Sequence, residues 1–352
     1  MKIGIIFGGK SFEHDISIIT ANVIYHALKD KYDVKLLYID KKGEFRLPSK
    51  LNVNDFAIGK KFRKFNFIKS GIITGFKKEK IDVLINLMHG INGEDGLGAV
   101  IANLYDIPYV GTNHISSGLL MDKYFTYAVL RLNGIKNINT KYYLIDDFIT
   151  SRSYPLIVKP ARLGSSIGIS KINNIFELNL KCKNAFLFDD KIVIQPYISD
   201  FKEFNQAAYI YDGNIVVSNV EQVFKSEDIL SFDDKYVSSK TPKKHAFVTD
   251  ENVVNKVSEI TKKIYRVLEL SGIVRIDYMM IKDEIYVNEI NTTPGSLAYY
   301  LFEEKILELL EKQIKTALLN FQNKKETVFQ SSILEQNYSI KKWLCDIIGL
   351  CW

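Results

Sequence analysis

Three oxygen-bearing side chains in the last third of the chain have the types and spacing of a divalent-metal site. Asp277 lies in an apolar run, residues 272–281, and Glu289 and Asn291 lie at the end of the next run, residues 284–290. Residues two apart on a strand project to the same side, so Glu289 and Asn291 share one side. Two carboxylates and an amide leave coordination positions open, which is typical of Mg²⁺ sites that handle nucleotide phosphates. The alternative is a β-hairpin with solvated acids, which is disfavoured because unpaired buried carboxylates are costly.

A second group of residues has the character of a phosphate-binding loop. Lys159 stands near the end of a buried strand predicted at residues 156–160, and the loop that follows contains Gly164-Ser165-Ser166. Backbone N–H groups and hydroxyls of such a loop can cover phosphate oxygens while the lysine neutralises their charge. A plain hairpin loop beside an exposed lysine is the alternative.

The strands and helices that must position these residues alternate along the N-terminal part of the chain. Strand-like runs at 2–7, 34–39 and 81–87 alternate with helix-like segments, of which residues 16–28 form the first. This order predicts a parallel, doubly wound sheet over about the first 115 residues, with ligands at the carboxyl ends of its strands.

Polar loops follow two of these strands and are expected at the same edge. Glu13 comes after the first strand, where it could hold a substrate ammonium or favour the start of the following helix. His89 and Glu94 follow the strand that ends at residue 87. The pattern Gly4-x-x-x-x-Gly9-Lys10-Ser11 formally matches a P-loop, but only three residues precede Gly4, which we place inside the first strand.

Composition indicates an ordinary globular chain. Its 352 residues are 47% hydrophobic and 25% charged, enough for two or three modest domains. No secretory signal is recognisable, and no run reaches the roughly 18 apolar residues of a membrane span. The three cysteines, Cys182, Cys345 and Cys351, are an odd number without metal-ligand spacing, so we expect the cytoplasm. The formal charge of +6 is spread along the chain without a nucleic-acid-binding motif, so no nucleic-acid partner is expected.

Taken together, the motifs resemble the D-alanine:D-alanine ligases of the ATP-grasp superfamily, in order, to about residue 320. The resemblance rests on GGKSFEHDIS, HGINGEDG, Met121-Asp122-Lys123, Ile157-Val158-Lys159-Pro160, LGSSIGIS, Lys235-Tyr236, Arg275-Ile276-Asp277 and Glu289-Ile290-Asn291-Thr292-Thr293-Pro294-Gly295. It implies an α/β chain with an N-terminal doubly wound substrate domain at 1–115, followed by the two α+β lobes of an ATP-grasp fold. The lobes would be a central lid domain at 116–200 and a C-terminal domain with the Mg²⁺ site at 201–322. Residues 323–352 would be an appendage, expected to be helical.

The resemblance also implies a role for each matching residue. ATP would be bound by Lys123, Lys159, Gly164, Ser165, Ser166, Gln195, Tyr197, Ile198 and Glu203, and Mg²⁺ or Mn²⁺ by Asp277, Glu289 and Asn291. The catalytic set would be Glu13, Ser165, Tyr236, Arg275 and Gly295, with Glu13 on the ammonium of the first D-alanine and Arg275 with the Gly295 N–H on the oxyanion. The other substrate-binding residues would be His89, Glu94, Lys235, Ser296 and Tyr300.

The implied reaction joins two D-alanine molecules through an acyl phosphate made from ATP, for peptidoglycan synthesis in a bacterial cytoplasm, by a protein expected to form a homodimer. A loop at 224–244 would close over the site, and its Tyr236 favours D-alanine over D-serine or D-lactate as the acceptor. A carboxylate-amine ligase for other amino acids and a catalytically silent ATP-binding protein are the alternatives.

Three features depart from the family pattern. Gln195 stands in the nucleotide hinge where relatives commonly have Glu, although an amide oxygen can still accept from the adenine amino group. Tyr300 stands where a serine is expected to hold the carboxylate of the second substrate. The chain also continues beyond residue 325, with apolar residues such as Trp343 and Ile347 at helical spacing, which we expect to dock on the body or on a second subunit.

Overall fold

The computed structural model describes residues 1–151, 153–224 and 246–324. Lys235, Tyr236, nearly all of the loop at 224–244 and nearly all of the appendage at 323–352 lie outside the described residues. Residues 1–321 form one compact unit, and the description below concerns this unit. No helix in the described ranges is long and apolar enough to cross a membrane.

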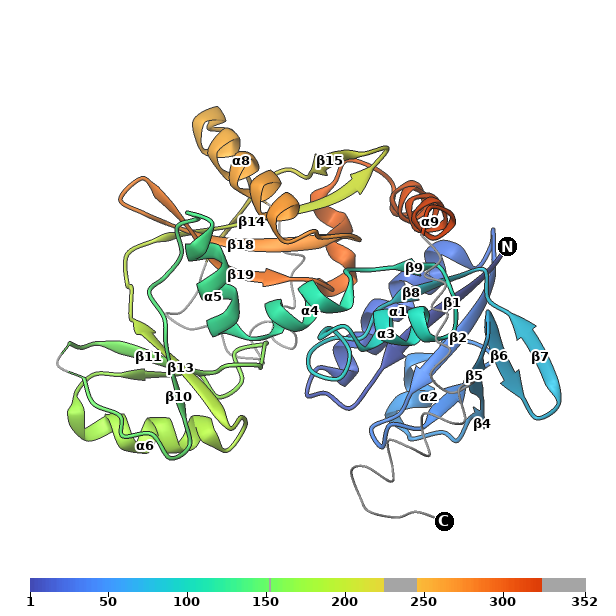
Figure 1. Ribbon diagram of the computed structural model, residues 1–352, viewed down its shortest axis with the longest axis horizontal. Helices are drawn as coiled ribbons and strands as arrows, with labels where there is room; N and C mark the ends of the chain where they lie inside the picture. The colour runs from blue at the N-terminus through green and yellow to red at the C-terminus, as the bar shows by residue number, and fades with distance from the viewer. Residues whose placement is uncertain (152, 225–245, 325–352) are drawn as a thin grey trace, which may run out of the picture. The chain divides into compact units, whose positions relative to one another are not determined.

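The N-terminal region contains the predicted parallel sheet, with an antiparallel extension at one edge (Figure 1). Its strands have the order β4-β3-β2-β1-β8-β9, where these are Arg63–Lys64, Phe45–Leu47, Asp33–Ile39, Lys2–Gly8, Val83–Asn86 and Tyr109–Val110. The four strands from β2 to β9 are parallel, as predicted, but β3 and β4 run antiparallel to their neighbours. Only a short turn joins β2 to β3, and a parallel pair would need a longer crossover. A separate antiparallel sheet contains β5 (Asn66–Ile68), β6 (Gly71–Thr74) and β7 (Lys77–Lys80).

Gly4 lies within β1, so the chain has no P-loop at its start. A Cβ at Gly4 would lie 3.0 Å from side-chain atoms of both Ile81 and Leu37, which explains the glycine by close packing. Helix α1 (His14–Leu28) follows β1, and α2 (Val53–Ala57) and α3 (Leu97–Leu104) lie farther along this region.

The sequence predicts a helix at 121–132, and α5 (Lys123–Leu132) covers this stretch apart from its first two residues, with a separate helix, α4 (His114–Met121), before it. Asp122 separates them with an extended backbone, and its Oδ1 accepts from the N–H groups of Tyr124 and Phe125 at 2.9 and 3.1 Å. An N-cap of this kind starts a helix at the next residue, so α5 begins at Lys123.

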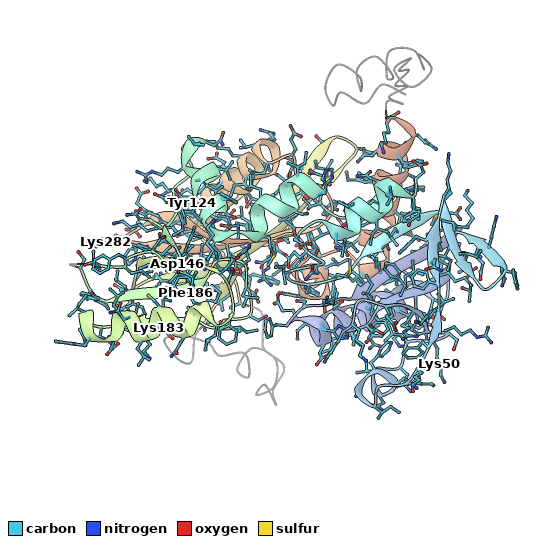
Figure 2. All side chains as sticks on the ribbon, turned by 60° about the horizontal axis from the view of Figure 1, so that its bottom comes forward. Lys50, Tyr124, Asp146, Lys183, Phe186 and Lys282 are labelled. Atoms are coloured by element: carbon cyan, nitrogen blue, oxygen red, sulfur yellow. The ribbon has the colours of Figure 1, made fainter. Side chains whose placement is uncertain are left out.

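The central region is a four-stranded antiparallel sheet covered by one helix. The strand order is β10-β13-β11-β12, or Lys141–Leu144, Lys191–Pro196, Leu156–Pro160 and Ser170–Ile172. Helix α6 (Ile175–Phe186) lies along this sheet (Figure 1) and buries Leu178, Cys182 and Ala185. Lys183 and Phe186 on the same helix are labelled in Figure 2. The loop 161–169 joins β11 to β12, as predicted.

The C-terminal region is a second antiparallel sheet with α8 packed on it. The order is β17-β16-β14-β18-β19, or Ala246–Phe247, Glu221–Val223, Lys202–Tyr211, Val274–Ile281 and Glu284–Asn291, and β15 (Asn214–Val217) also pairs with β14. Helix α8 spans Glu251–Val267. The sequence predicts a last helix at 301–319, whereas α9 (Ile306–Gln322) begins five residues later, after a separate turn at Gly295–Leu301.

Candidate active site

A cavity of about 780 Å³ contains most of the residues singled out from the sequence. Its lining comes from all three regions and includes Glu13, His89, Glu94, Lys123, Lys159, Gly164, Ser165, Gln195, Glu203, Arg275, Asp277, Glu289, Asn291, Gly295 and Tyr300. An adjoining cavity is lined by Ser166, Tyr197 and Ile198. Ser296 lines neither cavity. Segments far apart in the sequence therefore meet at one site.

The three oxygen-bearing side chains lie on paired strands. In the antiparallel pair β18 and β19, Asp277 is opposite Glu289 and Arg275 is opposite Asn291. Asn291 donates from Nδ2 to Asp277 Oδ2 at 3.2 Å, so the amide and this carboxylate converge. No cluster of three or more His, Cys, Asp or Glu side chains among the described residues could hold a metal ion. The set of two carboxylates and one amide nevertheless fits a hard cation that keeps other ligands for phosphate oxygens.

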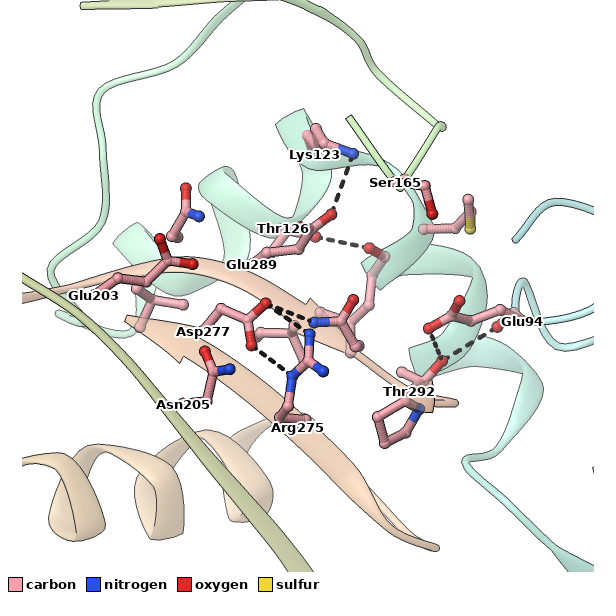
Figure 3. Close-up of a pocket in the computed structure, with 18 of the residues that line it drawn as sticks. Glu94, Lys123, Thr126, Ser165, Glu203, Asn205, Arg275, Asp277, Glu289 and Thr292 are labelled. Atoms are coloured by element: carbon pink, nitrogen blue, oxygen red, sulfur yellow. Dashed lines mark hydrogen bonds and ion pairs between the residues drawn. The ribbon is translucent and has the colours of Figure 1, made fainter. Parts of the chain in front are cut away.

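Cations balance the two carboxylates (Figure 3). Arg275 donates from Nε to Asp277 Oδ1 at 2.8 Å and from Nη2 to Asp277 Oδ2 at 3.0 Å. Lys123 Nζ lies 3.4 Å from Glu289 Oε1 and donates to the Leu163 carbonyl at 2.5 Å. The Lys123 ammonium therefore lies between Glu289, one of the candidate metal ligands, and the start of the Gly/Ser loop.

The hinge residue Gln195 is held by Thr140. Gln195 Nε2 donates to Thr140 Oγ1 at 2.8 Å, and the Thr140 hydroxyl donates to the Ile138 carbonyl at 2.7 Å. Because the only hydroxyl proton of Thr140 is used in this way, Thr140 can only accept from the amide. Gln195, which lines both cavities, therefore presents its nitrogen to Thr140 and keeps its oxygen as an acceptor.

Glu13 stands at the N-cap position of α1, but its side chain makes no capping hydrogen bond. Its Oε1 accepts a short hydrogen bond from the Ser165 hydroxyl, which joins the first loop of the chain to the Gly/Ser loop. A Cβ at Gly90 would lie 2.7 Å from Glu13 Oε2, and Gly90 has φ +69°. The glycine thus makes room for the carboxylate, and the capping alternative for Glu13 is not realised.

Two other titratable groups of the cavity lining, Glu94 and His89, have shifted pKa values. Burial and the charge of Glu13 raise the pKa of Glu94 to about 7. Burial and the charge of Arg275 lower the pKa of His89 to about 4. At neutral pH, His89 is uncharged and Glu94 is partly protonated.

Tyr300 lies beside Arg275. Burial alone would lower the pKa of Arg275, but Asp277 and a hydrogen bond with Tyr300 hold it well above its usual value. Burial raises the pKa of Tyr300, so its hydroxyl stays protonated at neutral pH. The tyrosine at the expected serine position therefore offers a hydroxyl at the cavity wall.

Sequence reasoning missed several side chains that hold this site. Thr20, Thr140, Thr292 and Thr293 all contact predicted site residues. The only sequence signal for Thr20 is that it is a polar residue on the buried side of α1, a property that it shares with His14 and Ser17. Lys235 and Tyr236 lie outside the described residues, so their roles stay predictions.

Comparisons with known proteins agree along the whole described chain. The family description "D-ala D-ala ligase N-terminus" matches residues 2–112, and "D-ala D-ala ligase C-terminus" matches residues 123–308. A D-alanine–D-alanine ligase of Thermosipho melanesiensis is 37% identical over 358 residues, covering 95% of this chain and 98% of that protein. The crystal structure of the D-alanine-D-alanine ligase from Helicobacter pylori superposes with a TM-score of 0.75 at 29% identity, covering 93% of this chain and 100% of that chain. The VanG D-Ala:D-Ser ligase from Enterococcus faecalis has a TM-score of 0.75 at 26% identity, covering 90% of this chain and 99% of that one.

Proposed function

The chain belongs to the D-alanine–D-alanine ligase family and has its ATP-grasp fold, and from this premise we propose how its residues join two D-alanine molecules to D-alanyl-D-alanine. The reaction depends on ATP and a divalent metal and supplies a dipeptide for cell-wall synthesis. The observation that supports our assignment is the single cavity in which Glu13, Arg275, two lysines and the three oxygen ligands meet.

In this proposal the nucleotide lies between the central and C-terminal regions. Lys123 and Lys159 bind the phosphates, and the loop Gly164-Ser165-Ser166 covers them with N–H groups and hydroxyls. The adenine contacts Gln195, Tyr197 and Ile198, and the ribose hydroxyls bind Glu203.

The metal is Mg²⁺ or Mn²⁺, held by Asp277, Glu289 and Asn291. When bound, it would neutralise charge on the phosphates during phosphoryl transfer. The strand pairing holds these side chains in place before a ligand arrives, so their arrangement costs little ordering on binding.

The first D-alanine binds through its ammonium to Glu13. The carboxylate of this D-alanine is a poor electrophile, and phosphorylation by ATP converts it into an acyl phosphate that an amine can attack. The free amine of the second D-alanine attacks the acyl carbon, and Arg275 with the Gly295 N–H stabilises the oxyanion of the tetrahedral intermediate, a contribution of roughly 3 kcal/mol per donor in other enzymes. The bond from the acyl carbon to the phosphate oxygen then breaks, and inorganic phosphate leaves as the peptide bond is completed. His89 and Glu94 support the loops around this substrate.

The carboxylate of the second D-alanine is assigned to the Tyr300 hydroxyl, with Ser296 as the second choice. Tyr300 lines the cavity and hydrogen-bonds with Arg275, whereas Ser296 does not line it. Tyr236 and Lys235 complete the closed site in this proposal, by analogy with the family.

Three broader assignments belong to the same proposal. The domains are 1–115, 116–200 and 201–322, followed by the appendage at 323–352. The protein acts in the cytoplasm and forms a homodimer. These follow from the family resemblance and from the sequence.

Phosphate release from ATP and Mg²⁺ tests the function, with D-alanine, L-alanine, D-serine and D-lactate compared and products identified by mass. We expect release that depends on D-alanine, with one dipeptide formed per phosphate. Release with another amino acid instead would keep the mechanism and overturn the substrate. No release with any of them would indicate a binding protein.

A further inference from the structure

The residues after Gly295 have an uncommon backbone. Ser296, Leu297 and Ala298 have φ values of 50°, 53° and 48°, the left-handed region that costs an L-residue roughly 1–2 kcal/mol. The turn follows directly on Gly295, whose N–H is assigned to the oxyanion. A strained turn persists only where its surroundings hold it, so the groups that hold it also set the direction of this N–H.

Three side chains of the N-terminal region contact the segment 292–296, and one of them, Thr20, contacts the turn itself. Thr20 Oγ1, on α1, accepts from the Ser296 N–H at 3.1 Å. The same oxygen lies 3.0 Å from His89 Nε2, and His89 also hydrogen-bonds with the Thr293 backbone. Glu94 Oε1 accepts from the Thr293 N–H at 3.1 Å, and Thr292 Oγ1 donates to the Glu94 carbonyl at 3.3 Å.

Among these contacts, that of Thr20 lies closest to Gly295 along the chain. Thr20 is only 1% exposed, so no water replaces its hydroxyl at Ser296. One hydroxyl can accept from Ser296 and donate to the neutral His89 ring at once, which an alanine or valine cannot do. Serine is the substitution that keeps both bonds.

We propose that Thr20 is a positioning residue that orients the Gly295 N–H for the oxyanion of the ligation reaction. The inference rests on the proposed function. Helix α1 has Glu13 at its N-cap and Thr20 seven residues later, about 10 Å along the helix axis at 1.5 Å per residue. One rigid helix therefore connects the group assigned to the substrate ammonium with the turn assigned to the oxyanion.

The test compares Thr20→Val and Thr20→Ala with Thr20→Ser. Without the hydroxyl, we expect kcat for dipeptide formation to fall at least about tenfold, because removing a whole oxyanion donor costs about 100- to 1000-fold. KM for ATP should stay within about twofold, and Thr20→Ser should keep most of the activity. Thr20→Ala, which adds no bulk, carries the test if the valine variant does not fold.

A second readout separates positioning from general destabilisation. A phosphinate analogue of the dipeptide has a tetrahedral P–O⁻ in place of the reacting carbonyl and reports oxyanion binding directly. Its affinity should fall by about the same factor as kcat in Thr20→Val, with little change in KM for D-alanine.

The matched control is Thr261→Val, which removes another fully buried threonine hydroxyl, one bonded to Gln206 and Tyr278 on the C-terminal sheet. It should lower thermal stability without changing phosphinate affinity. Equal phosphinate affinity in Thr20→Val and wild type would overturn the inference, as would equal losses in both variants. A wild-type protein that makes no dipeptide from any acceptor would overturn the proposed function itself.

Discussion

At the scale of single residues, the site is defined by charges that are already paired. Asp277 is bonded twice to Arg275, and Glu289 lies next to Lys123, so each carboxylate has a cation beside it at the cavity. A cation with phosphates attached would join an arrangement in which positive and negative groups already alternate. The charge of Glu289, rather than its shape, should therefore determine its contribution.

Glu289→Gln keeps the shape and removes the charge. We expect normal folding by circular dichroism and a fall of about 100-fold or more in Mg²⁺-dependent turnover, equivalent to about 2.7 kcal/mol in the activation barrier. Activity is measured over a Mg²⁺ titration. Glu284→Gln is the control, because Glu284 lies on the same strand and forms an exposed ion pair with Lys136. Near-normal turnover in Glu289→Gln would contradict the metal assignment.

At the scale of elements, the pairing of β10 with β13 places Thr140, the residue before β10, against Gln195 on β13, and Thr140 fixes the orientation of the Gln195 amide. The amide oxygen left for the nucleotide accepts from a 6-amino group, as in adenine, and would face the 6-oxygen of hypoxanthine unfavourably. In our proposal this amide oxygen binds the adenine amino group of ATP. Thr140 also restricts rotation of the amide, which a carboxylate would not require.

Thr140→Val removes this restriction and lets the amide present its nitrogen instead. We expect the preference for ATP over ITP, as a ratio of kcat/KM values, to fall about tenfold, in line with the roughly 1–3 kcal/mol cost of an unpaired buried polar group. Thr140→Ser should keep the wild-type ratio. If the ratio does not change in the valine variant, Thr140 does not set base selection.

The elements also show what the sequence could and could not predict. Strands β11, β18 and β19 and the convergence of Asp277, Glu289 and Asn291 could be predicted, because alternation and short spacing are local signals. The antiparallel strands β3 and β4 could not, since runs of three and two residues carry little pattern. The contacts of Thr20 with Ser296 and of Thr140 with Gln195 join residues 276 and 55 positions apart. No local pattern indicates such pairs.

At the scale of the whole molecule, His89 and Glu94 respond to pH in opposite directions. The folded protein holds the His89 pKa near 4, below its ordinary 6.5, so its contribution to stability is present above pH 6.5 and is lost as pH falls toward 4. The Glu94 pKa is raised from 4.5 to about 7, so its contribution is present below pH 4.5 and is lost as pH rises through 7. Between about pH 4.5 and 6.5 the free energy of unfolding gains from one group what it loses from the other, so the two pH dependences nearly cancel.

Substituting either residue alone should reveal the pH dependence of stability that the other residue causes. Relative to wild type, Glu94→Gln should lose stability as pH falls from 6.5 to 4.5, and His89→Gln should lose it as pH rises from 4.5 to 7. The expected differences reach about 1 kcal/mol per pH unit, reduced from the 1.36 kcal/mol limit because Glu94 is partly exposed. Urea unfolding without nucleotide or metal measures them. Parallel profiles for wild type and both variants would refute the assignment of these pKa values.

The largest apolar core among the described residues brings together the two ends of the compact unit at 1–321. Ile5 and Ile24 of the N-terminal sheet and helix share it with Tyr209, Leu301 and Leu310 of the C-terminal region. On the ribosome, the first hundred residues therefore emerge well before the side chains that cover one of their faces. An incomplete chain would expose this apolar surface to chaperones and to other nascent chains, and the protein reaches its folded state only after synthesis has passed α9.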